Sequence, residues 1–208
     1  RLPEIPGLDH PSVARYDDVL TGRRPVNGNV AIIGAGGIGF DLAVYLLEGD
    51  APSYSTPSAF ARAWGIDMTL SNAGGLSVDG KPHPTPARKI TMLKRSAGRF
   101  GATLGKTTGW VHKSVIDANE VECLSEVVYE QIDDDGLHVL VGDEQRCIFA
   151  DTIILCAGQE PLRDLEAPLT AAGQTVHLIG GAREASELDA KRAILEGLEK
   201  ALAFNDAG

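Results

Sequence analysis

The chain has 208 residues, of which 43% are hydrophobic and 23% are charged, a composition typical of globular rather than disordered proteins. Its 29 acidic and 19 basic side chains give a formal net charge of −10. This charge argues against a general nucleic-acid or anionic-membrane surface, because phosphate contacts need a surplus of lysine and arginine. No apolar run approaches the ~20 residues that a membrane-spanning helix requires. Three cysteines without CxxC spacing predict an intracellular, reduced, cytoplasmic protein.

In chain order, predicted strands alternate with predicted helices, which favours an α/β domain with a parallel sheet. Residues 1–27 form an N-terminal segment with one short helix. Residues 49–88 form a long loop region rich in Gly, Ser, Thr and Pro, which we call the excursion. The predicted strands cover 29–33, 89–94, 121–132, 137–141, 145–149, 152–156 and 175–179, and the predicted helices cover 13–20, 38–48, 59–64, 107–118 and 187–204.

The most specific local pattern is the run GAGGIG at residues 34–39, which matches GxGxxG between a strand and a helix. Gly34 allows a tight turn, Gly36 lets the backbone approach a pyrophosphate, and Gly39 lets helix and strand pack closely. The N–H groups at the helix N-terminus would face the phosphates. We therefore expect a dinucleotide to be bound by Gly34, Gly36, Gly37, Ile38 and Gly39. The alternative is a structural glycine turn without a ligand.

The end of the second predicted strand distinguishes NAD from NADP, because NAD sites place an acid there and NADP sites a basic residue. Residues 80–116 contain no acid, whereas Lys94, Arg95, Ser96 and Arg99 lie at or just beyond this strand end. This basic island favours NADPH, with Arg95, Ser96 and Arg99 as binding residues. A solvated basic loop is the alternative.

A third candidate segment is CAGQEP at residues 156–161, which follows a buried strand. A strand that ends in Ala-Gly and then Pro suits a chain that passes close beside a cofactor, so Ala157 and Gly158 are predicted to be cofactor contacts. An ordinary strand end is the alternative.

Together these segments resemble the two-dinucleotide flavoprotein reductases. More narrowly, the chain is similar to the C-terminal part of the bacterial NADPH-dependent 2,4-dienoyl-CoA reductases, which are related to old yellow enzyme and trimethylamine dehydrogenase. The resemblance extends over nearly all of residues 25–200. It is carried by VAIIGAGGIGFDLAVYL at 30–46, LGKTTGWVHK at 104–113, IDDDGLHV at 132–139, CAGQEP at 156–161, VHLIGGA at 176–182 and ELDAKRAI at 187–194. The most specific pieces are GKTTGW and ELDA.RAI.

The resemblance implies a Rossmann-like parallel sheet with a β-meander, as an NADPH-binding domain (26–155) inserted in an FAD-binding domain (1–25 and 156–208). In such enzymes NADPH reduces FAD, electrons pass through an iron–sulfur cluster to FMN, and FMN reduces the enoyl-CoA double bond in fatty acid β-oxidation. FMN and the cluster belong to an N-terminal barrel. That barrel, the remaining FAD domain and an acyl-CoA substrate are the implied partners, and Arg1 is expected to be a truncation point.

The resemblance also assigns roles to single residues. Arg95 matches a 2′-phosphate arginine, whereas Ser96 departs from the basic residue expected beside it. Gly181, Ala182 and Leu188 match a second FAD contact, where Ala182 replaces an acid and leaves only backbone contacts. No catalytic residue is assigned, because hydride transfer to a flavin needs orientation more than an acid or base.

Two other functions stay open: the nucleotide-holding domain of an amine dehydrogenase-like flavoprotein, and a free-standing dinucleotide-binding module without chemistry. The remaining polar candidates receive structural roles and no metal site is predicted. The triple aspartate at 133–135 is expected to be turn chemistry, because Asp-Gly supplies positive φ. Trp110 is expected to pack inward, with His112 and Lys113 structural or solvated. The core is expected to include Cys123, Cys147 and Cys156.

Overall fold

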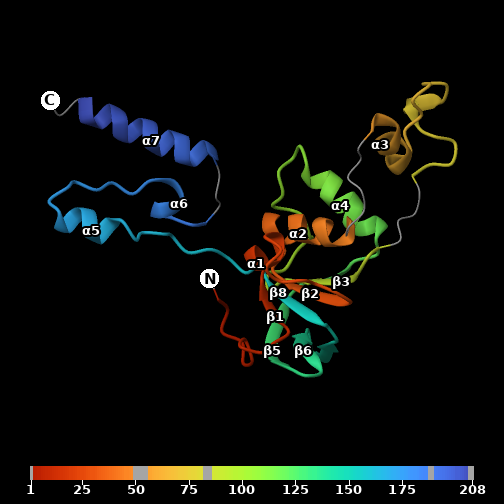
Figure 1. Ribbon diagram of the computed structural model, residues 1–208, viewed down its shortest axis with the longest axis horizontal. Helices are drawn as coiled ribbons and strands as arrows, with labels where there is room; N and C mark the ends of the chain where they lie inside the picture. The colour runs from red at the N-terminus through yellow and green to blue at the C-terminus, as the bar shows by residue number, and fades with distance from the viewer. Residues whose placement is uncertain (1, 49–55, 82–85, 187–189, 206–208) are drawn as a thin grey trace. The chain divides into compact units, whose positions relative to one another are not determined.

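The structure, a computed structural model, describes residues 2–48, 56–81, 86–186 and 190–205 (Figure 1). It divides into two compact units. The sheet unit consists of residues 4–156, and the C-terminal unit consists of residues 157–208 with residues 1–3.

The sheet unit is built on five parallel strands in the order β1-β8-β2-β3-β4. Their bounds are β1 Val13–Arg15, β8 Thr152–Leu155, β2 Asn29–Ile33, β3 Lys89–Leu93 and β4 Glu122–Leu124. Continuous apolar runs form the central strands because both faces of a parallel sheet are covered. Ile33 is in register with Leu93 on one side and Leu155 on the other. The parallel sheet predicted from the sequence is confirmed, and three strand ends meet at one edge.

Helix α2 (Gly37–Glu48) supplies most of the core beside this sheet, and α4 (Gly109–Ala118) packs next to α2. Phe40 and Leu42 of α2 are fully buried in one cluster with Met92 of β3 and Ile116 of α4. The other helices of this unit are α1 Tyr16–Leu20, α3 Pro57–Trp64 and the 3-10 helix η1 Ala73–Gly75. Both α3 and η1 lie in the predicted excursion.

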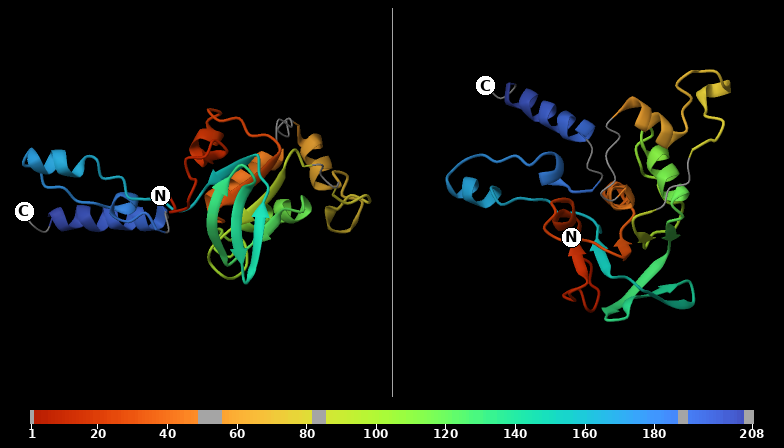
Figure 2. Two further views of the ribbon diagram at one scale, coloured as in Figure 1. Left: turned by 90° about the horizontal axis from the view of Figure 1, so that it is seen from below. Right: turned by 45° about the vertical axis from the view of Figure 1, so that its right-hand side comes forward.

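The meander is a separate antiparallel sheet of β5 (Val127–Asp133), β6 (Gly136–Val141) and β7 (Glu144–Ile148), whose strands lie side by side in Figure 2. The single strand predicted over 121–132 is wrong in this respect. The segment forms β4 in the parallel sheet and β5 in the meander. Glu126 between them has a φ of 58°, which breaks the extended backbone and lets the chain change sheets.

The N-terminal segment also differs from the prediction. The helix predicted over 13–20 begins only at Tyr16, because residues Val13–Arg15 form the edge strand β1 alongside β8. Residues 4–25 therefore lie in the sheet unit. The division into an inserted NADPH domain and two FAD-domain parts stays a prediction.

The C-terminal unit contains α5 (Glu166–Ala171), α6 (Gly180–Arg183) and α7 (Ala190–Asn205). The strand predicted over 175–179 is absent there, because a strand needs a hydrogen-bonded neighbour and the described residues of this unit supply none. None of the helices in the described ranges is long and apolar enough to cross a membrane.

Truncation of Phe40 tests the packing of α2 on the sheet. Phe40 is 0% exposed, so Phe40→Ala should lower the free energy of unfolding by about 3–5 kcal/mol through lost burial and the cavity left behind. Phe149→Ala is the matched control, because Phe149 is 64% exposed and should change stability far less. Urea unfolding followed by circular dichroism measures both, and equal losses would contradict the assigned core.

Candidate dinucleotide-binding site

The glycine turn, residues 34–39, connects β2 to α2 at the carboxyl edge of the parallel sheet. Gly34 adopts a φ of 117°, which side chains rarely allow, and its amide donates to the Leu93 carbonyl over 2.8 Å. On the other side of β2, the Cys156 amide donates to the Ile33 carbonyl over 2.8 Å. The turn is thus held from both neighbouring strands.

The glycines of this turn have different local requirements. A Cβ on Gly39 would lie 2.2 Å from the Gly34 carbonyl oxygen, so close packing of helix and strand requires glycine there. A Cβ on Gly36 or Gly37 would meet no atom within 4 Å, and both residues are exposed. The space directly beside the Gly36 and Gly37 backbone is therefore open to solvent. These residues fit the phosphates of a dinucleotide.

Electrostatics at the start of α2 also favour an anion. The first turn of α2 carries no acidic side chain, so nothing there neutralises the partial positive charge of its unpaired N–H groups. The nearest acid along the helix is Asp41, whose Oδ1 lies 3.6 Å from Nδ1 of His112 on α4.

The basic loop, residues 94–99, leaves β3 at the same sheet edge as the glycine turn. Lys94 folds back on it, since its Nζ donates to the Ala97 carbonyl over 3.2 Å and to the Arg99 carbonyl over 3.3 Å. Arg95, Ser96 and Arg99 are exposed, and neither arginine makes an ion pair with any described residue. Lys94 thus shapes the loop, whereas two guanidinium groups stay available to a phosphate.

Tyr129 on β5 lies within electrostatic range of Arg95 in this loop, which the sequence did not indicate. Burial raises the pKa of the Tyr129 phenol, and the positive charge of Arg95 opposes part of that rise. Nothing in the local sequence indicated this proximity, because Tyr129 belongs to the other sheet. Tyr129 is half-buried and lies within electrostatic range of Arg95.

The predicted contacts of the C-terminal unit lie in α6 and the segment after β8. Ala157 and Gly158 follow β8, and Gly181 and Ala182 lie in α6. Leu188 lies outside the described residues. The structure therefore brings together the glycine turn and the basic loop within the sheet unit, and these other residues belong to the second unit.

A buried carboxylate at α6 is a further feature that the sequence did not reveal. Glu196 of α7 is 8% exposed, and its Oε2 accepts from the Gly180 amide over 2.6 Å. Its Oε1 lies 3.2 Å from Arg183 and 3.6 Å from Arg192. Glu196 thus holds α6 against α7 and satisfies the Gly180 amide.

Side chains of α4 mostly take the structural roles expected of them. Lys113 pairs with Asp117 one turn later at 3.0 Å, and His112 pairs with Asp41. The inward packing predicted for Trp110 is wrong, because this side chain is 67% exposed and its indole N–H donates to the Thr107 carbonyl over 3.0 Å. That hydrogen bond holds the ring over the start of its own helix.

Cys123 and Cys156 do not have the properties of thiolate nucleophiles. Burial raises the pKa of Cys123 to about 11 and that of Cys156 to about 12. A reactive cysteine needs the opposite shift. The prediction of a core position is wrong for Cys147, which is exposed on the edge strand β7, where alternate residues face solvent.

Comparison with known proteins defines the family of this fold. The pyridine nucleotide-disulphide oxidoreductase family matches residues 1–183. A metal reductase of Desulforamulus reducens is 28% identical over 180 residues, which are 86% of this chain and 26% of that protein.

Two solved structures share the fold. A 2-naphthoyl-CoA reductase in complex with 2-naphthoyl-CoA superposes with a TM-score of 0.64 at 18% identity, over 95% of this chain and 24% of that one. The 6-hydroxypseudooxynicotine amine oxidase of Pseudomonas geniculata gives a TM-score of 0.65 at 18% identity, over 95% of this chain and 25% of that one. The chain thus spans about a quarter of the length of these proteins.

Two alanine substitutions in the glycine turn separate folding from binding. Gly36→Ala should leave the unfolding free energy nearly unchanged, because its Cβ meets no protein atom, but should weaken NADPH binding by occupying the phosphate space. Gly39→Ala, in contrast, should lower the free energy of unfolding in addition to weakening NADPH binding, because its Cβ collides with the Gly34 carbonyl. Calorimetric titration and thermal unfolding measure the pair. Full NADPH affinity in a folded Gly36→Ala would contradict the assigned phosphate position.

Alkylation at pH 8 tests the cysteine environments. Iodoacetamide reacts with thiolates, and a pKa of about 11 leaves only about one Cys123 thiol in a thousand ionised at this pH. Cys147 should therefore be modified first in EDTA-treated native protein because it is exposed, and Cys123 and Cys156 should become reactive only towards pH 11–12 or on unfolding. Peptide mass mapping measures the order, and early modification of Cys156 would disprove it.

Proposed function

We propose that this chain, which belongs to the pyridine nucleotide-disulphide oxidoreductase family, binds NADPH at the glycine turn and the basic loop and delivers its hydride to FAD. The observation that carries the proposal is the pair Arg95 and Arg99. Neither makes an ion pair with a described residue, and both follow the strand whose end is hydrogen-bonded to the glycine turn. An exposed pair of guanidinium groups beside a dinucleotide turn fits a 2′-phosphate, which NADPH has and NADH lacks.

In this proposal the chain's own groups bind NADPH and orient it. The amides at the start of α2 hold the pyrophosphate, and Gly36 lets it approach the backbone. Arg95, Ser96 and Arg99 hold the 2′-phosphate, the arginines through paired N–H groups. NADPH, when bound, supplies a hydride from its nicotinamide ring. No side chain of the site has to donate or accept a proton for that transfer.

The finer proposal is that this chain is the C-terminal region of a 2,4-dienoyl-CoA reductase-like enzyme. It is supported by the GKTTGW and ELDA.RAI sequences, which are more specific than the glycine run. In this proposal FMN and an iron–sulfur cluster lie in an N-terminal barrel, and the acyl-CoA substrate is reduced there. Ala157, Gly158, Gly181, Ala182 and Leu188 would contribute to the FAD site. The 2-naphthoyl-CoA reductase, which acts on a CoA thioester, shares the fold, and this likeness is compatible with the assignment.

A second candidate keeps the same NADPH half-reaction and changes the electron acceptor. It is favoured by the relative from Desulforamulus reducens, which is named a metal reductase and matches 86% of this chain. NADPH oxidation by the complete enzyme with a 2,4-dienoyl-CoA and with a soluble ferric complex distinguishes the two acceptors. Turnover with the dienoyl-CoA alone supports the finer proposal, and turnover with the ferric complex alone favours the second.

Two alternative functions involve no oxidation of NADPH: a free-standing dinucleotide-binding module and an amine dehydrogenase-like domain. Measurements of cofactor binding and of flavin reduction distinguish them from the proposed function. Titration of the chain with NADPH and NADH should show selective NADPH binding, and no binding of either would overturn the proposal. An amine dehydrogenase-like domain would hold a nucleotide without passing on a hydride. Failure of NADPH to bleach the flavin absorbance of the complete enzyme would indicate that function.

Arg95→Ala tests the cofactor assignment directly. Loss of charged hydrogen bonds to the 2′-phosphate should weaken NADPH binding by about 1–3 kcal/mol and leave NADH binding almost unchanged. Arg62→Ala is the matched control, because Arg62 is an exposed arginine on α3, outside the site. Fluorescence titration of both variants with both cofactors measures the difference. Equal losses for NADPH and NADH with Arg95→Ala would refute the role of this arginine.

A further inference from the structure

Three side chains with metal-binding atoms, Asp133, Asp135 and His138, converge at one end of the meander, and Cys147 lies next to His138. The NADPH proposal uses none of these four residues. Asp133 ends β5, and it pairs with Gly136 across the hairpin turn that contains Asp135. On the neighbouring strand pair, His138 of β6 lies directly opposite Cys147 of β7. Side chains of directly opposed residues point to the same face of a sheet. The antiparallel register therefore places the Cys147 thiol next to the His138 imidazole, and the hairpin turn places two carboxylates next to the same imidazole.

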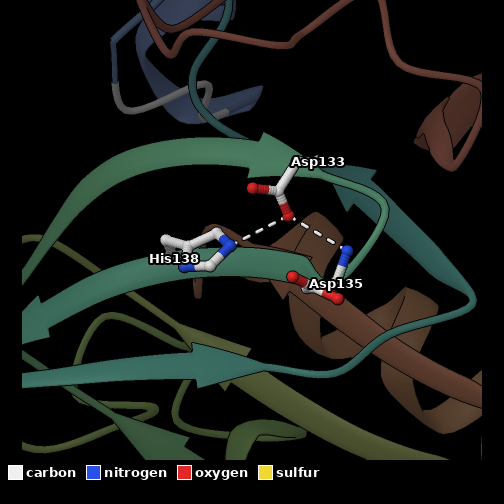
Figure 3. A group of neighbouring side chains, drawn as sticks. All are labelled: Asp133, Asp135 and His138. Atoms are coloured by element: carbon white, nitrogen blue, oxygen red, sulfur yellow. Dashed lines mark hydrogen bonds and ion pairs between the residues drawn. The ribbon is translucent and has the colours of Figure 1, made fainter.

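The distances between these groups are short. His138 Nε2 lies 2.9 Å from Asp133 Oδ1 and 3.9 Å from Cys147 Sγ. Ligand atoms of Asp133, Asp135 and His138 all lie within 4.8 Å of one another (Figure 3). The Cys147 thiol also donates to the Asp135 carbonyl over 3.4 Å, so sulfur lies beside the same turn. Zn–N and Zn–S bonds of about 2.0–2.3 Å imply ligand separations of about 3.3–3.6 Å in a tetrahedron. The separations around His138 bracket that value.

Charge at this end of the meander favours a cation. Neither Asp133 nor Asp135 pairs with a lysine or arginine among the described residues. The ion-pair partner of Asp133 among these residues is the His138 imidazole, which is charged only when it is protonated. Arg146 is the nearest cation lining the adjoining hollow, and its guanidinium is already bound to Glu122 at 2.7 Å. The two carboxylates thus lack a permanent positive partner.

We propose that Asp133, Asp135, His138 and Cys147 bind one divalent transition-metal ion of the zinc class. A thiolate, an imidazole nitrogen and carboxylate oxygens are the donors that Zn²⁺ accepts in four-coordinate sites, and magnesium or calcium would reject the sulfur. The hollow lined by His138 and Cys147, with a volume of about 420 Å³, gives the ion access from solvent.

The place of the site in the fold indicates its role. The four residues come from β5, the hairpin turn, β6 and the edge strand β7, so one ion bound by all four would cross-link every strand of the meander. Zn²⁺ has no redox chemistry, and a closed four-ligand site leaves no position for a substrate. The ion would therefore stabilise the meander, whose strand β5 carries Tyr129 beside the basic loop.

The sequence alone predicted no metal site here, because the triple aspartate is sufficient to explain a turn and the cysteines lack CxxC spacing. The structure shows that the turn and the ligand cluster use the same residues. Asp133 accepts from the Asp135 amide at 3.0 Å through the same Oδ1 that faces His138. The turn hydrogen bond thus orients a carboxylate toward the imidazole.

Cobalt titration of the untagged, EDTA-treated chain tests the proposal. Co²⁺ should bind at one equivalent per chain with a sulfur-to-cobalt charge-transfer band, and one equivalent of Zn²⁺ should abolish that band. Cys147→Ser should remove the band, and His138→Ala should weaken Zn²⁺ binding at least tenfold. Asp143→Asn, in the exposed turn between β6 and β7, is the matched control and should bind like the parent chain.

Two further measurements separate metal binding from misfolding. Far-ultraviolet circular dichroism must show that Cys147→Ser is folded, and Zn²⁺ should raise the melting temperature of the parent chain but not of this variant. Zn²⁺ should also protect Cys147 from iodoacetamide. A charge-transfer band that persists in folded Cys147→Ser would overturn the proposal, as would unchanged Zn²⁺ affinity in both variants or no saturable binding by the parent chain.

Discussion

The parallel register of β8, β2 and β3 is the constraint on which the candidate cofactor site depends. Because Ile33 is aligned with both Leu93 and Leu155, these three strands end at the same edge of the sheet. The glycine turn and the basic loop are therefore neighbours, although the long excursion separates them in sequence. Gly39 then sets how closely α2 approaches the turn, since the Gly34 carbonyl occupies the position of any side chain there. Site geometry is thus a consequence of sheet packing.

Charge is distributed so that an acidic protein still offers an anion site. The net charge is −10, yet the first turn of α2 carries no acid and two arginines of the basic loop have no ion-pair partner in the described part of the chain. The Lys94 ammonium group donates hydrogen bonds to backbone carbonyls of that loop rather than to a ligand. At the hairpin turn of the meander the arrangement is reversed, because Asp133 and Asp135 pair with no lysine or arginine among the described residues. The sheet unit therefore offers two places that are suited to ligands of opposite charge.

Burial governs what the side chains of this unit can do chemically. It raises the pKa values of Cys123, Cys156 and Tyr129, so these groups stay protonated near neutral pH. These groups therefore supply packing rather than a nucleophile. That property agrees with a function in which the reactive chemistry belongs to the bound cofactors.

The sequence by itself determined the glycine turn, the parallel sheet, the basic loop and the hairpin of the meander, because each depends on short-range patterns of glycine, apolar residues and charge. It could not determine that 121–132 divides between two sheets, because the break is a left-handed backbone at Glu126, a conformation that the identity of this residue does not indicate. Nor could it show Tyr129 beside Arg95, or Cys147 opposite His138. Such pairs are set by strand register, which depends on long-range packing. Tertiary structure alone therefore decided which polar groups meet, and with them the candidate metal site.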